Sequence, residues 1–258
     1  MVPIGRWRLV DTDAAPGPRT AALDEAIARS RSAGEVPDTL HFYRRRPPAV
    51  TLGYSLDAAA EVDIEYCARK GIDVVRRLSG GGAIYTDDRQ LVYSLTTKGM
   101  LPTSVEASLK KVCTAVADAL SSLGTEAQFA PVNDVLIGGR KVSGSAQLRK
   151  WGVVLQHGTV LVDADPEQMF CALRVPQDKR RKHSLDDPRL RVTTLKAELG
   201  RLPPMDEVRT ALKKAFERAF GVTILPGHIT PGEEMMARQF MKDRYGNDDW
   251  NLRRKTSD

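Results

Sequence analysis

The chain has 258 residues, of which 41% are hydrophobic and 20 are glycine, so its composition is that of a globular domain and excludes a disordered chain. No apolar stretch approaches the roughly 18 residues that span a membrane, and the first residues lack a signal-peptide core, so we expect a cytoplasmic protein with no membrane partner. The formal net charge of +6 allows an acidic partner, and the segment 174–191 carries seven of the basic residues.

The first part of the chain alternates strand-like and helix-like segments. Residues 7–10 are predicted to form a strand, and residues 23–34 a helix that ends at Gly34. Strands are expected at 40–44 and 49–54, separated by two prolines that cannot continue a central ladder. A helix over 64–70 is followed by the apolar run 72–75.

The second part begins with the longest helical pattern. Apolar residues recur every three or four positions from Val105 to Leu123, which predicts a helix packed on a core. The turn Gly138-Gly139 between 135–137 and 140–149 predicts a hairpin, and 151–163 a further strand. Helices are expected at 205–220 and after the capping box 230–233. We therefore predict an α+β fold, with mixed, largely antiparallel sheets and flanking helices, in one domain over 1–258.

Three segments could carry chemistry, and the first is Arg76-Arg77-Leu78-Ser79 followed by three glycines. Glycines permit close backbone approach, successive N–H groups can bind an anion, and arginines supply bidentate donors. The alternative is a flexible turn with two solvated arginines, and the sequence leaves both open.

The second segment is the hairpin that contains Asp134 and Lys141. Strand alternation places Lys141, Ser143 and Ser145 on one side, where small neighbours would leave room for a carboxylate and a phosphate beside the lysine. A solvent-exposed lysine is the alternative. Asp134 could satisfy a turn or bind Mg²⁺.

The third segment places His157 and Gly158 in an apolar strand, which suggests either a site of close approach or a satisfied core histidine. No G-x-S-x-G motif marks a nucleophile, and the three cysteines have no C-x-x-C spacing. The four histidines lie far apart in the sequence, so a zinc site has no support.

In order, the segments 23–27, 39–54, 74–87, 133–147, 155–165 and 189–195 resemble the lipoate–protein ligase family, within the group that includes biotin ligases and octanoyltransferases. The resemblance implies the biotin/lipoate ligase catalytic fold. It also implies ATP-dependent, Mg²⁺-dependent activation of lipoate to lipoyl-AMP, followed by transfer to a lysine of a lipoyl carrier domain. The expected carriers are acyltransferase subunits or a protein like the glycine-cleavage H protein.

The resemblance also assigns residues. Lys141 is similar to the family's catalytic lysine, Asp134 to a candidate Mg²⁺ ligand, and His157 to a residue lining the acyl or acceptor side. The substrate- or adenylate-binding residues implied in this way are Arg76, Arg77, Ser79, Gly80, Gly81, Gly82, Ala83, Tyr85, Asn133, Asp134, Ser143, Gly144, Ser145, Ala146, His157, Gly158 and Thr159.

Two features depart from the family pattern. Thr86 stands where the family usually has a histidine, and the usual small C-terminal accessory domain has no counterpart, so a separate accessory subunit is a candidate partner. The nearest alternative is an octanoyltransferase that needs no ATP. Some relatives of that kind use a cysteine before the segment equivalent to 132–137, and this chain has none there. A nucleic-acid-binding module is a further alternative, but only 6% of the residues are aromatic, so we expect no nucleic-acid partner.

Overall fold

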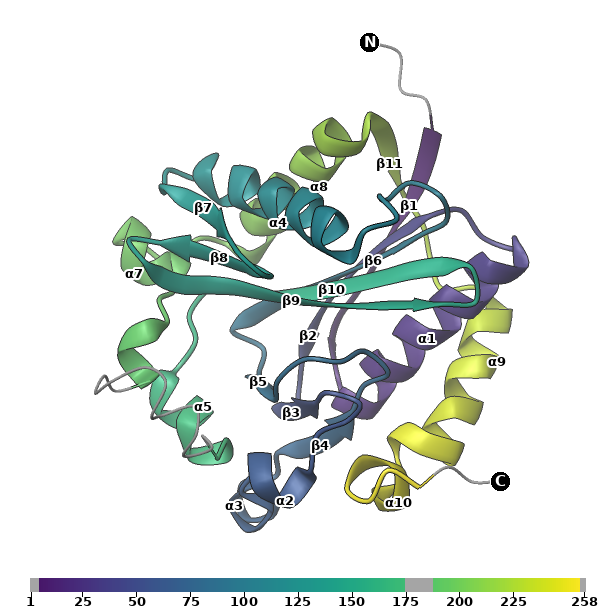
Figure 1. The fold of residues 1–258 in the computed structure, drawn as a ribbon, viewed down its shortest axis with the longest axis vertical. Coiled ribbons are helices and arrows are strands. Elements are labelled where there is room, and N and C mark those ends of the chain that lie inside the picture. The colour runs from purple at the N-terminus through teal and green to yellow at the C-terminus, as the bar shows by residue number, and fades with distance from the viewer. Residues whose placement is uncertain (1–4, 175–187, 256–258) are drawn as a thin grey trace.

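The computed structural model describes residues 5–174 and 188–255, and its centre is an eight-stranded mixed sheet (Figure 1). The strand order is β11-β1-β2-β6-β10-β9-β8-β7, in which β1 pairs in parallel with β11 and β2 and all other neighbours are antiparallel. These strands are β1 (Gly5–Ala15), β2 (Thr39–Arg45), β6 (Gln90–Thr97), β7 (Ala127–Ala130), β8 (Asp134–Ile137), β9 (Arg140–Lys150), β10 (Val153–Leu161) and β11 (Val222–Pro226).

A second, three-stranded sheet has the order β4-β3-β5 and lies beside the first. Its strands are β3 (Ala49–Leu52), β4 (Asp73–Arg76) and β5 (Ile84–Thr86). The helices are α1 (Gly17–Ala33), α2 (Ala58–Glu61), α3 (Ile64–Lys70), α4 (Val105–Ser121), α5 (Pro166–Ala172), α7 (Leu195–Leu199), α8 (Met205–Phe220), α9 (Pro231–Phe240) and α10 (Asp248–Asn251). A 3-10 turn, η1 (Pro188–Arg191), and a π turn, η2 (Met241–Tyr245), complete the described elements.

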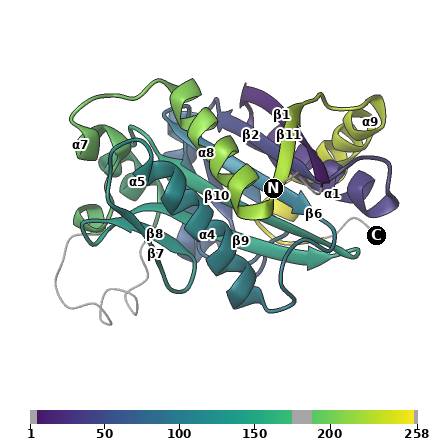
Figure 2. The ribbon, with the colours of Figure 1, turned by 90° about the horizontal axis from the view of Figure 1, so that it is seen from above.

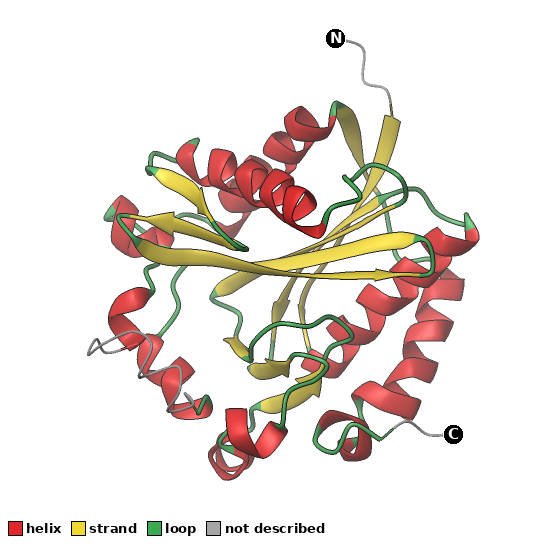
Figure 3. Ribbon diagram, in the orientation of Figure 1, coloured by secondary structure: helices red, strands yellow, loops and turns green. Residues whose placement is uncertain are grey.

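Helices cover both faces of the large sheet (Figures 1 and 2). On one face α4 and α8 pack against each other and against the sheet, where Leu120, Leu212 and Phe216 belong to the main core. On the other face α1 packs against α9 and the C-terminal turns, around Leu23 and Trp250. The small sheet has its own core with α3 and α5. The predicted fold class is therefore confirmed (Figure 3).

Several predicted elements differ from the structure. Helix α1 begins at Gly17 rather than at residue 23, because prolines at 16 and 18 open it and most of its residues are buried on all sides, which removes the periodic signal. The central strand β6 was not predicted. Most of the basic segment 174–191 lies outside the described residues. Within the described ranges, no helix is long and apolar enough to cross a membrane.

Candidate active site

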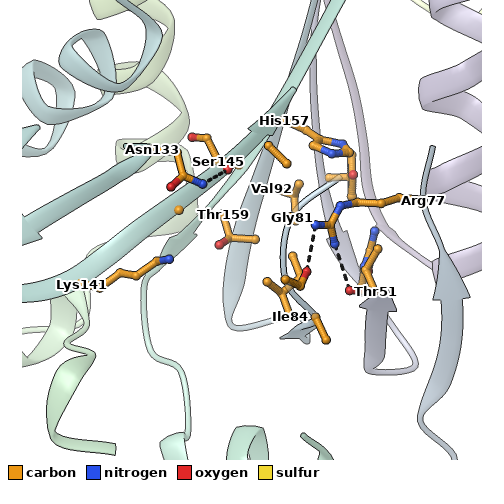
Figure 4. Close-up of a pocket in the computed structure, with 17 residues that line it drawn as sticks. Thr51, Arg77, Gly81, Ile84, Val92, Asn133, Lys141, Ser145, His157 and Thr159 are labelled. Atoms are coloured by element: carbon orange, nitrogen blue, oxygen red, sulfur yellow. Dashed lines mark hydrogen bonds between the residues drawn. The ribbon is translucent and has the colours of Figure 1, made fainter. Parts of the chain in front are cut away.

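A cavity of about 180 Å³ lies between the two sheets (Figure 4). It is bordered by β2 and β3 on one side, by β9 and β10 on the other, and by the glycine-rich loop that joins β4 to β5. The 17 lining residues are Tyr43, Arg45, Thr51, Arg77, Gly81, Gly82, Ala83, Ile84, Val92, Asn133, Lys141, Gly144, Ser145, Ala146, His157, Gly158 and Thr159. Three of them are cationic and none is acidic.

Lys141 reaches into this cavity from β9 (Figure 4). Its Nζ lies 2.7 Å from Asp134 Oδ1, so the carboxylate fixes the position of the ammonium group. A Cβ at Gly144 would stand 2.5 Å from Lys141 Cε, which is far inside van der Waals contact. Glycine at position 144 is therefore what allows the lysine side chain to lie across the strand.

A β-bulge in β9 changes which of its side chains lie on the same face, contrary to the prediction. Val135 pairs with Ser143 and Leu136 with Lys141, so Val142 is an extra residue on β9. The extra residue reverses the alternation, so Lys141 shares a face with Gly144 rather than with Ser143. Ser143 is 1% exposed and does not line the cavity.

Arg77 faces Lys141 from the opposite side of the cavity (Figure 4). Its guanidinium donates to Ser79 Oγ and to the carbonyl oxygens of Thr51, Gly80 and Gly82, all of which are neutral acceptors. Burial, together with the nearby charge of Arg45, lowers the Arg77 pKa to about 10. A buried cation held only by neutral groups is suited to stabilise a negative charge that develops beside it.

Arg76, predicted as a second substrate contact, points elsewhere. It is 1% exposed, and its guanidinium donates to the carbonyl oxygens of Gly53, Tyr54, Leu56 and Trp250. Its backbone N–H donates to Asn251 Oδ1, and its carbonyl accepts from Trp250 Nε1. Neighbouring residues on a strand face opposite ways, so Arg77 lines the cavity, whereas Arg76 connects the loop that follows β3 to α10.

The glycine-rich loop packs tightly on β3. A Cβ on Gly53 would lie 2.0 Å from the carbonyl oxygen of Gly81, so the two main chains are in direct contact. Gly81 itself has φ of +96°, a conformation that favours glycine. The close approach seen here is between two segments of the chain, and the approach of this loop to a ligand stays a prediction.

A buried polar group lies beside the cavity and centres on Asp24 of α1. His157 Nδ1 lies 3.4 Å and His41 Nδ1 3.0 Å from this carboxylate, and the Tyr43 hydroxyl donates to it at 3.0 Å. Burial alone would raise the Asp24 pKa, but the hydrogen bonds from both histidines outweigh it and lower the pKa. Burial lowers the pKa of His157, against the opposing effect of Asp24. The other ring nitrogen of His157 lies 2.7 Å from Ser79 Oγ.

The structure thus brings together most of the predicted residues. Of the predicted set, Arg76, Ser79, Gly80, Tyr85, Asp134 and Ser143 do not line the main cavity, although Asp134 holds Lys141 and Ser79 contacts His157. Sequence reasoning missed Tyr43, Arg45, Thr51, Ile84 and Val92. Period-two spacing in β2 could have placed His41, Tyr43 and Arg45 on one face.

Thr86, which replaces the usual family histidine, accepts a hydrogen bond from Arg45 at 3.1 Å and is fully buried. It therefore positions one of the three cations that line the cavity. No group of three or more potential metal ligands occurs among the described residues, and the Asp134 carboxylate is engaged by Lys141. A Mg²⁺ ion held partly by phosphate oxygens needs only one or two protein carboxylates, so Asp134 as a Mg²⁺ ligand stays a prediction.

Comparison with known proteins identifies the class. A family model described as the lipoyl protein ligase A/B catalytic domain matches residues 17–217, and the chain belongs to this family. Octanoyltransferase LipM from Symbiobacterium thermophilum is 36% identical over 96% of this chain and 98% of that protein. The protein of the same name from Kyrpidia tusciae is 33% identical, over 96% of this chain and 99% of its own length.

Solved structures give the same fold. A bipartite lipoate protein ligase of Thermoplasma acidophilum, described with its E2 lipoyl domain, has a TM-score of 0.87 and 31% identity over 98% of this chain and 99% of its own. A lipoate-protein ligase A bound with ATP has a TM-score of 0.82 and 30% identity, over 96% of this chain and 98% of its own.

These relatives correct the expected reaction. The prediction of an ATP-dependent lipoate ligase is wrong, because the curated relatives that match almost the whole chain are named octanoyltransferases, the alternative that the sequence left open. The motifs that carried the resemblance are common to both activities, and the missing cysteine before position 133 favoured the ligase in the sequence. The chain is an enzyme of a family that handles lipoyl or octanoyl groups in protein modification.

Proposed function

We propose that this protein transfers an octanoyl group from a thioester donor, such as an acylated carrier protein, to a lysine amine of a lipoyl domain, without ATP. The observation that carries the proposal is the match of almost the whole chain to proteins named octanoyltransferase. The three cationic side chains that line the cavity support it, because they can stabilise the negative charge that develops in acyl transfer. Ile84 and Val92 add apolar surface for a neutral acyl chain.

Acyl transfer passes through a tetrahedral intermediate whose carbonyl oxygen becomes negative. Lys141 and Arg77 lie on opposite sides of the cavity, so an acyl carbonyl between them would meet fixed positive charge as it reacts. Each such donor contributes about 2.7–4 kcal/mol in comparable enzymes.

A lipoyl domain is the acceptor that the relatives favour, since the bipartite ligase of Thermoplasma acidophilum is described with its E2 lipoyl domain. We place the reaction in the cytoplasm, as the sequence suggests. The single-domain organisation over 1–258 and the separate accessory subunit stay predictions.

The test incubates the purified protein with octanoyl-acyl carrier protein and an apo lipoyl domain, in the absence of ATP and Mg²⁺. We expect the lipoyl domain to gain the mass of one octanoyl group, and a lipoyl domain whose acceptor lysine is replaced by arginine to gain none. Modification that requires octanoate with ATP and releases AMP would contradict the proposal. Lys141→Ala serves as the inactive control.

A further inference from the structure

Arg76 connects the loop between β3 and α2, residues 53–57, to the C-terminal helix α10. Its Nη1 donates to three main-chain carbonyl oxygens of this loop, at distances from 2.7 to 3.1 Å. Its Nε donates to the carbonyl oxygen of Trp250 at 3.2 Å. The side chain is buried, so these hydrogen bonds are shielded from bulk water, which strengthens them. Three parts of the chain that are far apart in the sequence therefore meet at one guanidinium group.

Helix α10 lies beside β4 and also fixes the main chain of Arg76 (Figure 1). Trp250 Nε1 donates to the Arg76 carbonyl oxygen, and the Arg76 N–H donates to Asn251 Oδ1, both at 2.9 Å. Asn251 Nδ2 in turn donates to the carbonyl oxygen of Tyr245 at 2.8 Å, and both Trp250 and Asn251 are buried. Because α10 binds the main chain and the side chain of Arg76, a displacement of α10 is passed to the end of β4.

The β3–α2 loop contacts the glycine-rich loop on its other side. The Tyr54 N–H donates to the Ser79 carbonyl oxygen at 2.9 Å, and no room remains for a side chain between Gly53 and Gly81. The glycine-rich loop then holds Arg77, whose Nη2 donates to two carbonyl oxygens of this loop at 2.7 Å and 2.9 Å. A continuous series of contacts therefore leads from α10 to the guanidinium group in the cavity.

We propose, on the basis of the function proposed above, that Trp250 and Asn251 are positioning residues for octanoyl transfer. They act through Arg76 on Arg77, the cation that lies opposite Lys141. Neither Trp250 nor Asn251 lines the cavity, so neither contacts the acyl group there. A fixed cation stabilises a developing negative charge only from the correct position, and a displacement of about 1 Å can cost a hundredfold in rate. The packing of α10 is therefore a requirement of catalysis as well as of stability.

The first experiment measures octanoyl transfer by Trp250→Phe, which keeps an aromatic ring and removes the N–H that binds the Arg76 carbonyl. We expect kcat to fall roughly tenfold, while the KM for octanoyl-acyl carrier protein stays within about twofold, because the lost interaction is made only in the transition state. Asn251→Ala should change both constants in the same direction. Ser104→Ala is the matched control, because it removes the N-cap of α4 and no contact of the cavity. It should lower the thermal midpoint to a similar extent and transfer like the wild type.

A second measurement separates positioning from a general loss of structure. Arg77→Met removes the cation on which Trp250 acts, so adding Trp250→Phe to this variant should lower kcat by less than about twofold further. General destabilisation would lower kcat by the same factor in both backgrounds.

Hydrogen–deuterium exchange gives a readout that needs no substrate. The amides of Tyr54 and Arg77 donate to the Ser79 and Leu52 carbonyl oxygens, at 2.9 Å and 3.0 Å. These two amides should exchange faster in Trp250→Phe than in the wild type, because the loops that they connect are held less firmly. The amides of β9 should exchange at unchanged rates.

The outcomes separate this inference from the proposed function. The inference is overturned if Trp250→Phe keeps kcat within twofold of the wild type, if its loss is equally large in the Arg77→Met background, or if Ser104→Ala loses as much. Failure of Trp250→Phe to fold would also overturn it, because Trp250 would then support the fold as a whole. A wild type that transfers no octanoyl group refutes the proposed function instead, and the exchange rates still test the link between α10 and the glycine-rich loop.

Discussion

Replacing Gly144 by alanine tests the position of Lys141 without removing any charged group. The new Cβ would stand 2.5 Å from Lys141 Cε and 2.6 Å from Nζ, whereas ordinary contact begins at 3.4 Å, so the lysine terminus must move by about 0.9 Å. The atoms that clash are the end of a flexible side chain, so the fold can absorb the change. The ammonium group would then shift from its position 2.7 Å from Asp134 Oδ1.

A displacement of about 1 Å at a catalytic group can cost a hundredfold in rate. We therefore expect Gly144→Ala to lower kcat for octanoyl transfer roughly tenfold to a hundredfold, approaching the loss in Lys141→Ala. Its thermal midpoint should stay close to that of the wild type. Gly232→Ala is the matched control, because its new Cβ would have no neighbour closer than 3.9 Å. A well-folded Gly144→Ala variant with kcat within twofold of the wild type would refute the placement of Lys141.

Four further predictions concern packing, the C-terminal turns and the pH dependence of catalysis and of stability. Gly158→Ala should lower the free energy of unfolding by about 1–3 kcal/mol in urea, since its Cβ would lie 2.4 Å from Tyr93 Oη in the core. Asn251→Ala should cost about 1–3 kcal/mol in the same assay, because it leaves the buried Arg76 N–H without an acceptor. The kcat/KM profile should fall on the acid side with an apparent pKa below 6.5, because burial lowers the His157 pKa and only the neutral ring accepts a proton. Because the His157 pKa is lowered in the folded protein, the unfolded chain binds more protons than the folded one near pH 6.5. The free energy of unfolding should therefore fall as the pH drops through 6.5, and a free energy of unfolding that stays constant down to pH 5 would contradict this prediction.

Local patterns in the sequence predicted the elements that are amphipathic or bounded by glycine. Helix α3 is ended by Gly71 as expected. Helix α4, which begins at Val105, was predicted from its periodic pattern, because one face of it packs on the core. The hairpin of β8 and β9 followed from Gly138 and Gly139, which both have positive φ.

The remaining features depend on tertiary contacts. The facing of Lys141 follows from the bulge at Val142, which no local pattern marks. The contact between Asp24 and His157 joins residues 133 positions apart, and a buried carboxylate in a helix has no signal of its own in a single sequence. The reaction could not be predicted because sister activities use the same motifs.

The link between Arg76 and the C-terminal turns has a consequence for synthesis of the chain. The strand that leads into the glycine-rich loop is held by Trp250 and Asn251, which are translated about 175 residues later. A nascent chain on the ribosome can build the large sheet before these residues emerge, since domains fold as their residues become available. The loop that carries Arg77 and Ser79 is then anchored only near the end of translation, so activity in a truncated nascent chain should lag behind formation of the core.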